Sequence, residues 1–159
     1  MMKKEEKMLV EFYKSHRNAK TPVRANPSDA GLDVFACFDD KDTIMSINPG
    51  ESVLVNTGLK FGIPHGYMLQ VMNRSSVASK RSLVVGAHVV DSGYDGQIFI
   101  NLHNIGNQTE FISHGEKIAQ LVMLPVIHFR AIESLDDNLY EEPLTISNRG
   151  DGALGSTDV

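Results

Sequence analysis

The chain has 159 residues, of which 42% are hydrophobic and 22% are charged, with a formal net charge of -5 at pH 7. This length suits one domain with a core of its own, and the acidic balance disfavours nucleic acid as a partner. Cys37 is the only cysteine, so we expect no intrachain disulfide and a reducing compartment. No apolar run approaches the roughly 18 residues of a membrane span, and the N-terminus lacks the apolar stretch of a signal peptide. We therefore expect a cytoplasmic protein without a membrane partner.

Short β-type segments separated by turn residues dominate the chain, which predicts an all-β sandwich, barrel or jelly roll. Each segment is rich in β-branched residues or alternates apolar with polar side chains. The segments are residues 8–13, 51–57, 67–72, 83–90, 97–104 and 118–132. A helix of one or two turns fits residues 75–80, and residues 133–148 read as an extended connector.

Two polar stretches interrupt this pattern in the first two thirds of the chain. In NRSSVAS (73–79), Arg74, Ser75 and Ser76 follow a strand and would form an anion pocket at a helix start; the alternative is a serine N-cap beside a solvated arginine. In VVDSGYDGQIFI (89–100), two apolar runs predict a hairpin with Asp95–Gly96 at its tip. Asp91 would then form an Asx turn or orient a water that attacks a magnesium-bound phosphate.

Two polar side chains lie within apolar strands. In GEKIAQL (115–121), alternation places Ile118 and Gln120 on one face and Lys117 on the other. A buried Gln120 amide needs a partner, either a backbone group or a ligand, since leaving it unpaired costs about 1–3 kcal/mol. In AGLDVFA (30–36), Asp33 predicts a structural salt bridge or hydrogen bond.

The chain ends in RGDGALGSTDV (149–159), which combines glycines with groups that suit a phosphate. Arg149, Ser156 and Thr157 are these groups. Glycine allows the backbone to approach an anion closely.

These five stretches, in this order from about residue 29 to residue 157, resemble the five motifs of the homotrimeric deoxyuridine triphosphatases (dUTPases). The resemblance implies a jelly-roll-like (β-clip) subunit in a threefold trimer and the hydrolysis of dUTP to dUMP and pyrophosphate. It implies Mg²⁺ held mainly by the substrate's phosphates, with no direct protein ligand. It divides the chain into a single domain, 1–148, and a mobile tail, 149–159, that closes over a neighbouring subunit's site.

The resemblance also assigns roles to individual residues. Asp91 matches the water-activating aspartate, Asp33 a catalytic aspartate near the water and the metal, and Tyr94 the tyrosine beneath the deoxyribose. The backbone around residues 85–90 would read the uracil edge. The substrate-binding positions are Arg74, Ser75, Ser76, Tyr94, Lys117, Gln120, Arg149, Leu154, Ser156 and Thr157.

This chain departs from the family pattern at three positions, and other readings stay open. Leu154 replaces a phenylalanine that stacks on uracil, His88 replaces a glycine, and Lys117 replaces an arginine. One alternative is a dCTP deaminase-like enzyme of the same superfamily. A second is a nucleotide-sensing binding module with weak catalysis, and a third is a structural β-trimer without a ligand.

Overall fold

The computed structural model describes residues 8–137 and 139. The chain divides into two units, Met1–Ile127 and His128–Val159, and every strand and helix of the described residues lies in the first unit. The single helix in this described part lacks the length and apolar character needed to cross a bilayer.

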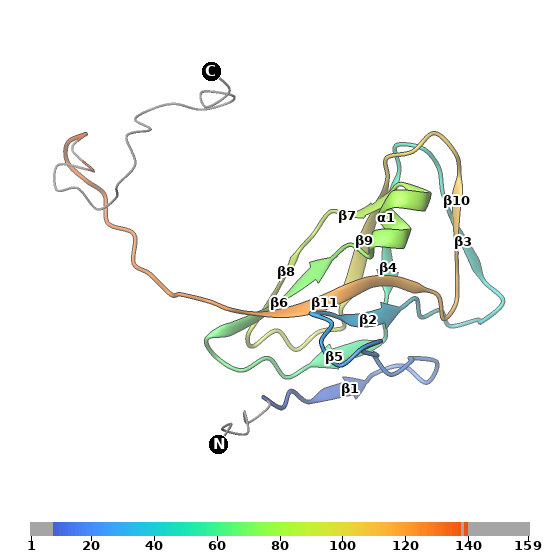
Figure 1. Cartoon of the computed structure of the whole chain (residues 1–159), viewed down its shortest axis with the longest axis horizontal. Helices are drawn as coiled ribbons and strands as arrows, with labels where there is room; N and C mark the ends of the chain where they lie inside the picture. The colour runs from blue at the N-terminus through green and yellow to red at the C-terminus, as the bar shows by residue number, and fades with distance from the viewer. Residues whose placement is uncertain (1–7, 138, 140–159) are drawn as a thin grey trace. The chain divides into compact units, whose positions relative to one another are not determined.

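Antiparallel sheets build the first unit (Figure 1). A four-stranded sheet contains, in spatial order, β2 (Leu32–Phe35), β11 (Lys117–Pro125), β6 (Tyr67–Met72) and β8 (Val89–Asp91). A three-stranded sheet contains β4 (Ser52–Asn56), β9 (Phe99–Asn104) and β7 (Leu83–Val85). Two further pairs join β1 (Phe12–Lys14) to β5 (Leu59–Phe61) and β3 (Ile44–Ile47) to β10 (Glu110–Ser113). The helix α1 (Ser75–Arg81) contacts β7.

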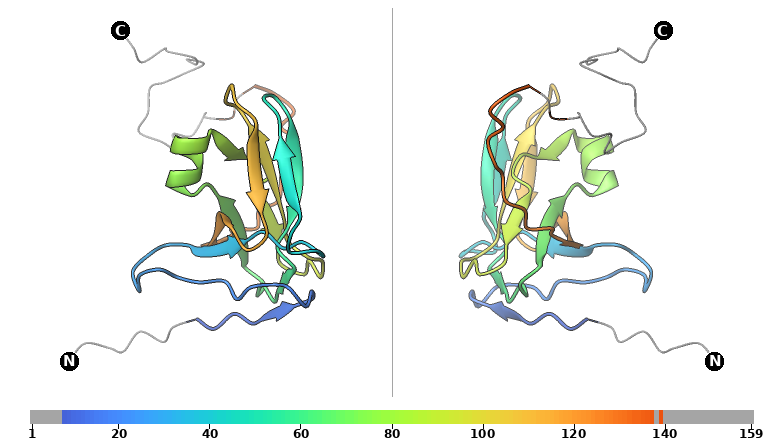
Figure 2. Two further views of the ribbon diagram at one scale, coloured as in Figure 1. Left: turned by 90° about the vertical axis from the view of Figure 1, so that its right-hand side faces the viewer. Right: turned by 90° about the vertical axis from the view of Figure 1, so that its left-hand side faces the viewer.

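Apolar side chains on alternate strand positions form the core between these sheets. On β9, Ile100 and Leu102 are fully buried, whereas Phe99 points to the other face and is exposed. This two-residue period is what a half-buried strand requires. Both views in Figure 2 place β10 between α1 and β3.

The predicted β-rich fold is confirmed, and several element boundaries agree closely. The expected strand at 67–72 is β6, and the expected short helix is α1. The apolar run 83–90 is divided into β7 and β8, which belong to different sheets. The last strand ends at Pro125 instead of continuing to 132. The strands β3, β5 and β10 were not predicted, because runs of three or four residues carry little periodic signal.

The predicted hairpin over residues 89–100 is wrong. β8 pairs with β6, and β9 pairs with β4 and β7. The chain turns earlier than expected: the Tyr94 N–H donates to the Asp91 carbonyl at 3.3 Å, and Gly93 takes φ 87°, which glycine adopts without strain. Two apolar runs around a loop do not reveal whether the runs pair with each other or with other strands.

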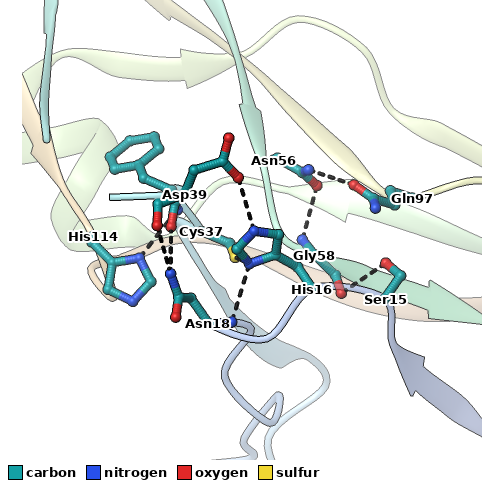
Figure 3. Close-up of polar contacts among 10 residues, drawn as sticks. Ser15, His16, Asn18, Cys37, Asp39, Asn56, Gly58, Gln97 and His114 are labelled. Carbon is teal, nitrogen blue, oxygen red and sulfur yellow. Dashed lines mark hydrogen bonds and ion pairs between the residues drawn. The ribbon is translucent and has the colours of Figure 1, made fainter. Parts of the chain in front are cut away.

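A polar cluster ties the N-terminal loop to the segment after β2 (Figure 3). His16 Nε2 lies 2.8 Å from Asp39 Oδ1, and its Nδ1 accepts the Asn18 backbone N–H at 3.1 Å. A backbone N–H only donates, so Nδ1 is unprotonated and Nε2 carries the proton. The Cys37 thiol lies 3.2 Å from the same Nδ1. Burial, and then the Asp39 charge, raises the pKa of Cys37, so this thiol stays protonated near neutral pH.

Candidate active site

Asp33, Arg74 and Lys117 form a charged cluster from three separate elements. Arg74 Nε donates to Asp33 Oδ1 at 2.9 Å, and Lys117 Nζ donates to Asp33 Oδ2 at 2.8 Å. The Asp33 side chain is only 14% exposed. Each carboxylate oxygen thus faces one cation, and the predicted salt bridge of Asp33 is confirmed. Two cations around one carboxylate leave a net positive charge at the surface.

Strand β11 brings these residues together because it lies between β2 and β6. Gln120 is the register partner of Asp33 on one side and of Met72 on the other. The stretches around Asp33, Arg74 and Gln120, far apart in the sequence, therefore meet at one end of the four-stranded sheet.

A register shift between Lys117 and Ala119 corrects the predicted alternation of β11. Ile118 and Ala119 are both buried, whereas Lys117 and Gln120 are both half-buried. A β-bulge of this kind re-aims side chains. The prediction of opposite faces for Lys117 and Gln120 is therefore wrong, because a simple alternation does not include the bulge.

The side-chain amide of Gln120 has a backbone group as its hydrogen-bond partner. Its Nε2 donates to the Asn73 carbonyl at 2.9 Å, which ties β11 to the residue before Arg74. Gly31 makes room for this side chain, since a Cβ at Gly31 would overlap Gln120 Oε1. Gly31 was not predicted as a site residue, although it lies two positions before Asp33.

Arg74 is the N-cap residue of α1, and no side chain caps the helix. The predicted alternative, a serine cap beside a solvated arginine, is wrong: the Arg74 side chain is 25% exposed and paired with Asp33. Within residues 8–137, its terminal guanidinium nitrogens donate no hydrogen bond, and Ser75 and Ser76 are exposed. Guanidinium, hydroxyls and the unpaired amides of a helix start all suit an anion.

Arg81 holds the other end of α1. Its Nε donates to Glu110 at 2.6 Å, its Nη1 pairs with Glu116, and its Nη2 donates to the Phe111 carbonyl at 2.6 Å. Because the helix is fixed at both ends, Ser75 and Ser76 are presented on a rigid element.

The second part of the candidate site lies around Asp91, at the end of β8. Asp91 is exposed, and within residues 8–137 its carboxylate accepts no hydrogen bond or ion pair. It lines a pocket of about 190 Å³ together with Val89, Tyr94 and Phe99. The Tyr94 hydroxyl donates to the Gln97 carbonyl at 2.9 Å, and a Cβ at Gly96 would overlap the tyrosine ring. The Asx-turn reading of Asp91 finds no support in this geometry.

The two parts do not meet within one chain. Asp91 is opposite Met68 on β6, whereas Gln120 is opposite Met72. Four residues of strand separate these positions by about 13 Å, and β8 and β11 flank β6 on opposite sides. Within a single chain, the cation cluster and Asp91 are therefore too far apart to contact the same phosphate group.

The remaining predicted residues fall elsewhere. His88 is held against β6, with its Nδ1 3.1 Å from the Val71 carbonyl, and it does not belong to the described lining of the Asp91 pocket. Arg149, Leu154, Ser156 and Thr157 lie outside the described residues. Gln97 and Phe99 were not predicted as site residues; only their position directly after the Tyr94 loop could have pointed to them.

The described part of the chain is a β-sheet protein with a cluster of cations that suits phosphate and a separate small pocket lined by Asp91, and these are features that a nucleotide-binding β protein needs. Residues 17–157 match the dUTPase family, and the chain belongs to that family. This confirms the resemblance found in the sequence.

Individual relatives agree with this assignment. The deoxyuridine 5'-triphosphate nucleotidohydrolase of Desulfotalea psychrophila is 38% identical over 140 residues, which cover 87% of each chain. That of Hydrogenobaculum sp. is 35% identical over 155 residues, covering 96% of this chain and 99% of the relative. Among solved structures, a Staphylococcus bacteriophage 80alpha dUTPase mutant with dUpNHpp has a TM-score of 0.80 and 25% identity, covering 95% of this chain and 99% of that one. The phage phi11 dUTPase, whose structure includes a structural Mg(II) ion, has a TM-score of 0.73 and 25% identity, covering 82% and 99%.

Proposed function

We propose that the chain is a dUTP diphosphatase that hydrolyses dUTP to dUMP and pyrophosphate. The observation that carries this proposal is the exposed Asp91 carboxylate, which has no partner within residues 8–137 and lies beside the Tyr94 pocket in a chain of the dUTPase family. A carboxylate without a protein partner is available to hold and deprotonate a water molecule.

The cation cluster binds the triphosphate. Arg74 directs its terminal guanidinium nitrogens to phosphate oxygens, because its Nε is already occupied by Asp33. The hydroxyls of Ser75 and Ser76 add hydrogen bonds, and Lys117 adds charge without the bidentate geometry of an arginine. Gln120 contributes by holding the Asn73 backbone.

Asp33 acts in this proposal as a positioning residue. Both of its oxygens are engaged by cations, so it orients Arg74 and Lys117 instead of accepting a proton from water. The resemblance implied that Asp33 is catalytic, whereas in this proposal Asp33 only positions the two cations.

Asp91 activates the nucleophile. It accepts a proton from a water that attacks the α-phosphorus, the bond from that phosphorus to the bridging oxygen breaks, and pyrophosphate leaves. A Mg²⁺ ion bound by the substrate's phosphates would neutralise their charge, so that a water activated by a weak base could attack the phosphorus. Within residues 8–137 and 139, no group of three or more His, Cys, Asp or Glu side chains could hold a metal ion.

Tyr94 selects the deoxyribose. Its hydroxyl donates to the Gln97 carbonyl, and its ring lies against Gly96, where a Cβ would overlap it. A ring pressed against C2′ leaves no room for a ribose hydroxyl, so UTP is excluded.

A homotrimer completes the site by joining Asp91 of one subunit to the cation cluster of another. The separation of about 13 Å along β6 supports this arrangement. Exposed apolar side chains on the segment after β11 also call for a partner surface. They are Ile127 at 88%, Phe129 at 84%, Ile132 at 84% and Leu135 at 101% exposure.

Residues 149–159 add the last contacts of the proposed site. Arg149, Ser156 and Thr157 bind phosphate oxygens, and Leu154 covers the base. We keep the predicted division of the chain into a domain, 1–148, and a tail, 149–159, and its cytoplasmic location, as parts of this proposal.

The test is pyrophosphate release with Mg²⁺ from dUTP, run beside dCTP, dTTP and UTP. Release from dUTP alone supports the proposed function. Ammonia released from dCTP would establish the deaminase alternative, and tight dUTP binding without any release would establish the sensor alternative.

The shared site has a test of its own. Asp91→Asn and Arg74→Ala are each inactive in the proposal, but mixed trimers contain some sites with neither change, roughly a quarter after random exchange. Activity that returns on unfolding and refolding the two variants together supports a site built from two subunits. A mixture that stays inactive, although native mass spectrometry shows mixed trimers, would place both residues in one subunit's site.

A further inference from the structure

Phe99 has an aromatic side chain that does not pack in the core. It is the first residue of β9, opposite Asn56 on β4, and it is 46% exposed. The next residue, Ile100, is fully buried. The strand therefore places Ile100 in the core and directs the Phe99 ring outward.

The Phe99 ring lines the pocket that contains Asp91. Val89 and Tyr94, two further exposed apolar groups, line it too. The pocket volume of about 190 Å³ is below the range of roughly 300–1,000 Å³ typical of drug-sized ligands. A pocket of this size with apolar and aromatic walls suits one planar ring.

The backbone that leads into Phe99 is rigid. The Thr57 hydroxyl donates to the Ile98 carbonyl at 2.7 Å, and the Ile98 N–H donates to the Leu59 carbonyl at 2.9 Å. The side chain of Asn56 also bonds the side chain of Gln97. These bonds fix the position of the ring before any ligand arrives, which lowers the ordering cost of binding.

We propose that Phe99 is a specificity-determining residue that supplies the aromatic contact to the pyrimidine base in this pocket. The inference rests on the proposed function, because Tyr94 is there assigned to the sugar. Leu154 stands where the family carries a stacking phenylalanine, so the tail offers no ring to the base. Phe99 provides one from the rigid part of the site, with the face or edge of the ring against the base.

The test compares Phe99→Leu with Phe111→Leu. Both changes remove an exposed ring, and Phe111, on β10, is 56% exposed and lies outside the pocket. Phe99→Leu is expected to raise KM for dUTP by about two- to tenfold, as for the loss of one aromatic pair, with kcat changed less than twofold. Phe111→Leu is expected to keep the KM of the unmodified protein.

A second readout reports the ring directly. The uracil H5 and H6 resonances of dUMP in fast exchange should shift upfield on binding, and Phe99→Leu should reduce this shift. An undiminished shift in Phe99→Leu overturns the inference whatever the assembly state of the variant. A Phe99→Tyr variant, which keeps the ring, should retain the original KM; a KM equal to that of Phe99→Leu overturns it too.

The two readouts separate this inference from the proposed function. Absence of pyrophosphate release from dUTP would defeat the proposed function, whereas the dUMP shift needs no turnover. If Phe99→Leu hydrolyses dUTP normally, with an unchanged KM and an unchanged shift of the dUMP resonances, the inference about Phe99 is overturned and the proposed function stands.

Discussion

Asp33 and Arg74 are 41 positions apart in the chain, yet Arg74 Nε donates to Asp33 Oδ1 at 2.9 Å. The other Asp33 oxygen is occupied by Lys117. One carboxylate therefore sets the orientation of two cations, and the free end of Arg74 is left for a ligand.

Asp33→Asn should weaken substrate binding, because an amide replaces one cation-facing oxygen by a donor. A hydrogen bond to a charged group contributes about 1.5–3 kcal/mol, so kcat/KM for dUTP should fall by roughly ten- to a hundredfold. The measurement is steady-state pyrophosphate release. Asp39→Asn is the control, because Asp39 pairs with His16 and its side chain is 97% exposed. Equal kcat/KM in both variants would refute the positioning role.

Asp91→Asn should abolish most turnover and leave nucleotide binding intact. The side chain keeps its shape but loses the base, and a general base contributes about 10²–10⁴-fold to the rate. Single-turnover kinetics and calorimetric titration with dUTP measure the two effects separately. Turnover at the original rate would remove Asp91 from the mechanism.

Gly31→Ala should lower activity by displacing Gln120. A Cβ at Gly31 would overlap Gln120 Oε1, which disturbs the bond from Gln120 to the Asn73 carbonyl and so the start of α1. We expect kcat/KM to fall by about tenfold or more, with a small change in melting temperature. Gly62→Ala is the matched control, because the nearest atom to its Cβ would be 3.7 Å away. A fully active Gly31→Ala variant would show that Gln120 does not position the site.

His114 should make folding stability depend on pH. Burial, followed by the charges of Lys41 and Lys20, lowers the pKa of His114. Its Nδ1 accepts the Phe38 N–H at 3.1 Å, which only an unprotonated Nδ1 does.

The sign follows from proton binding. Below pH 6.5, the ordinary value, the unfolded chain binds the proton before the folded chain does, so stability decreases as pH falls towards the lowered pKa. Melting temperatures between pH 7.5 and 5 measure this slope. His114→Asn should flatten it. A slope equal to that of the unmodified protein would exclude His114 as the source.

Leu154→Phe should tighten nucleotide binding if residue 154 covers the base. A second aromatic contact contributes about 0.5–1.5 kcal/mol, which corresponds to roughly a two- to tenfold lower Kd. Calorimetric titration with a non-hydrolysable dUTP analogue gives the Kd. An unchanged Kd would mean that this side chain does not touch the base.

Local patterns in the sequence predicted the features that depend on neighbours along the chain. Alternation in residues 67–72 gave the bounds of β6, and the polar run after it gave α1. The five ordered motifs predicted the family, because each motif is a short continuous stretch whose chemistry is visible without the fold. Asp33, Arg74, Lys117 and Gln120 were predicted as site residues on this basis.

Strand pairing and side-chain contacts were decided only by the tertiary structure. An apolar run shows that a strand has a buried face but not which strand lies beside it, so the pairing of β8 with β6 could not be predicted. The bulge in β11 places Lys117 and Gln120 on one side, against simple alternation. The separation of Asp91 from Arg74 follows from the register on β6. These features depend on packing between residues distant in sequence, and no local pattern contains that information.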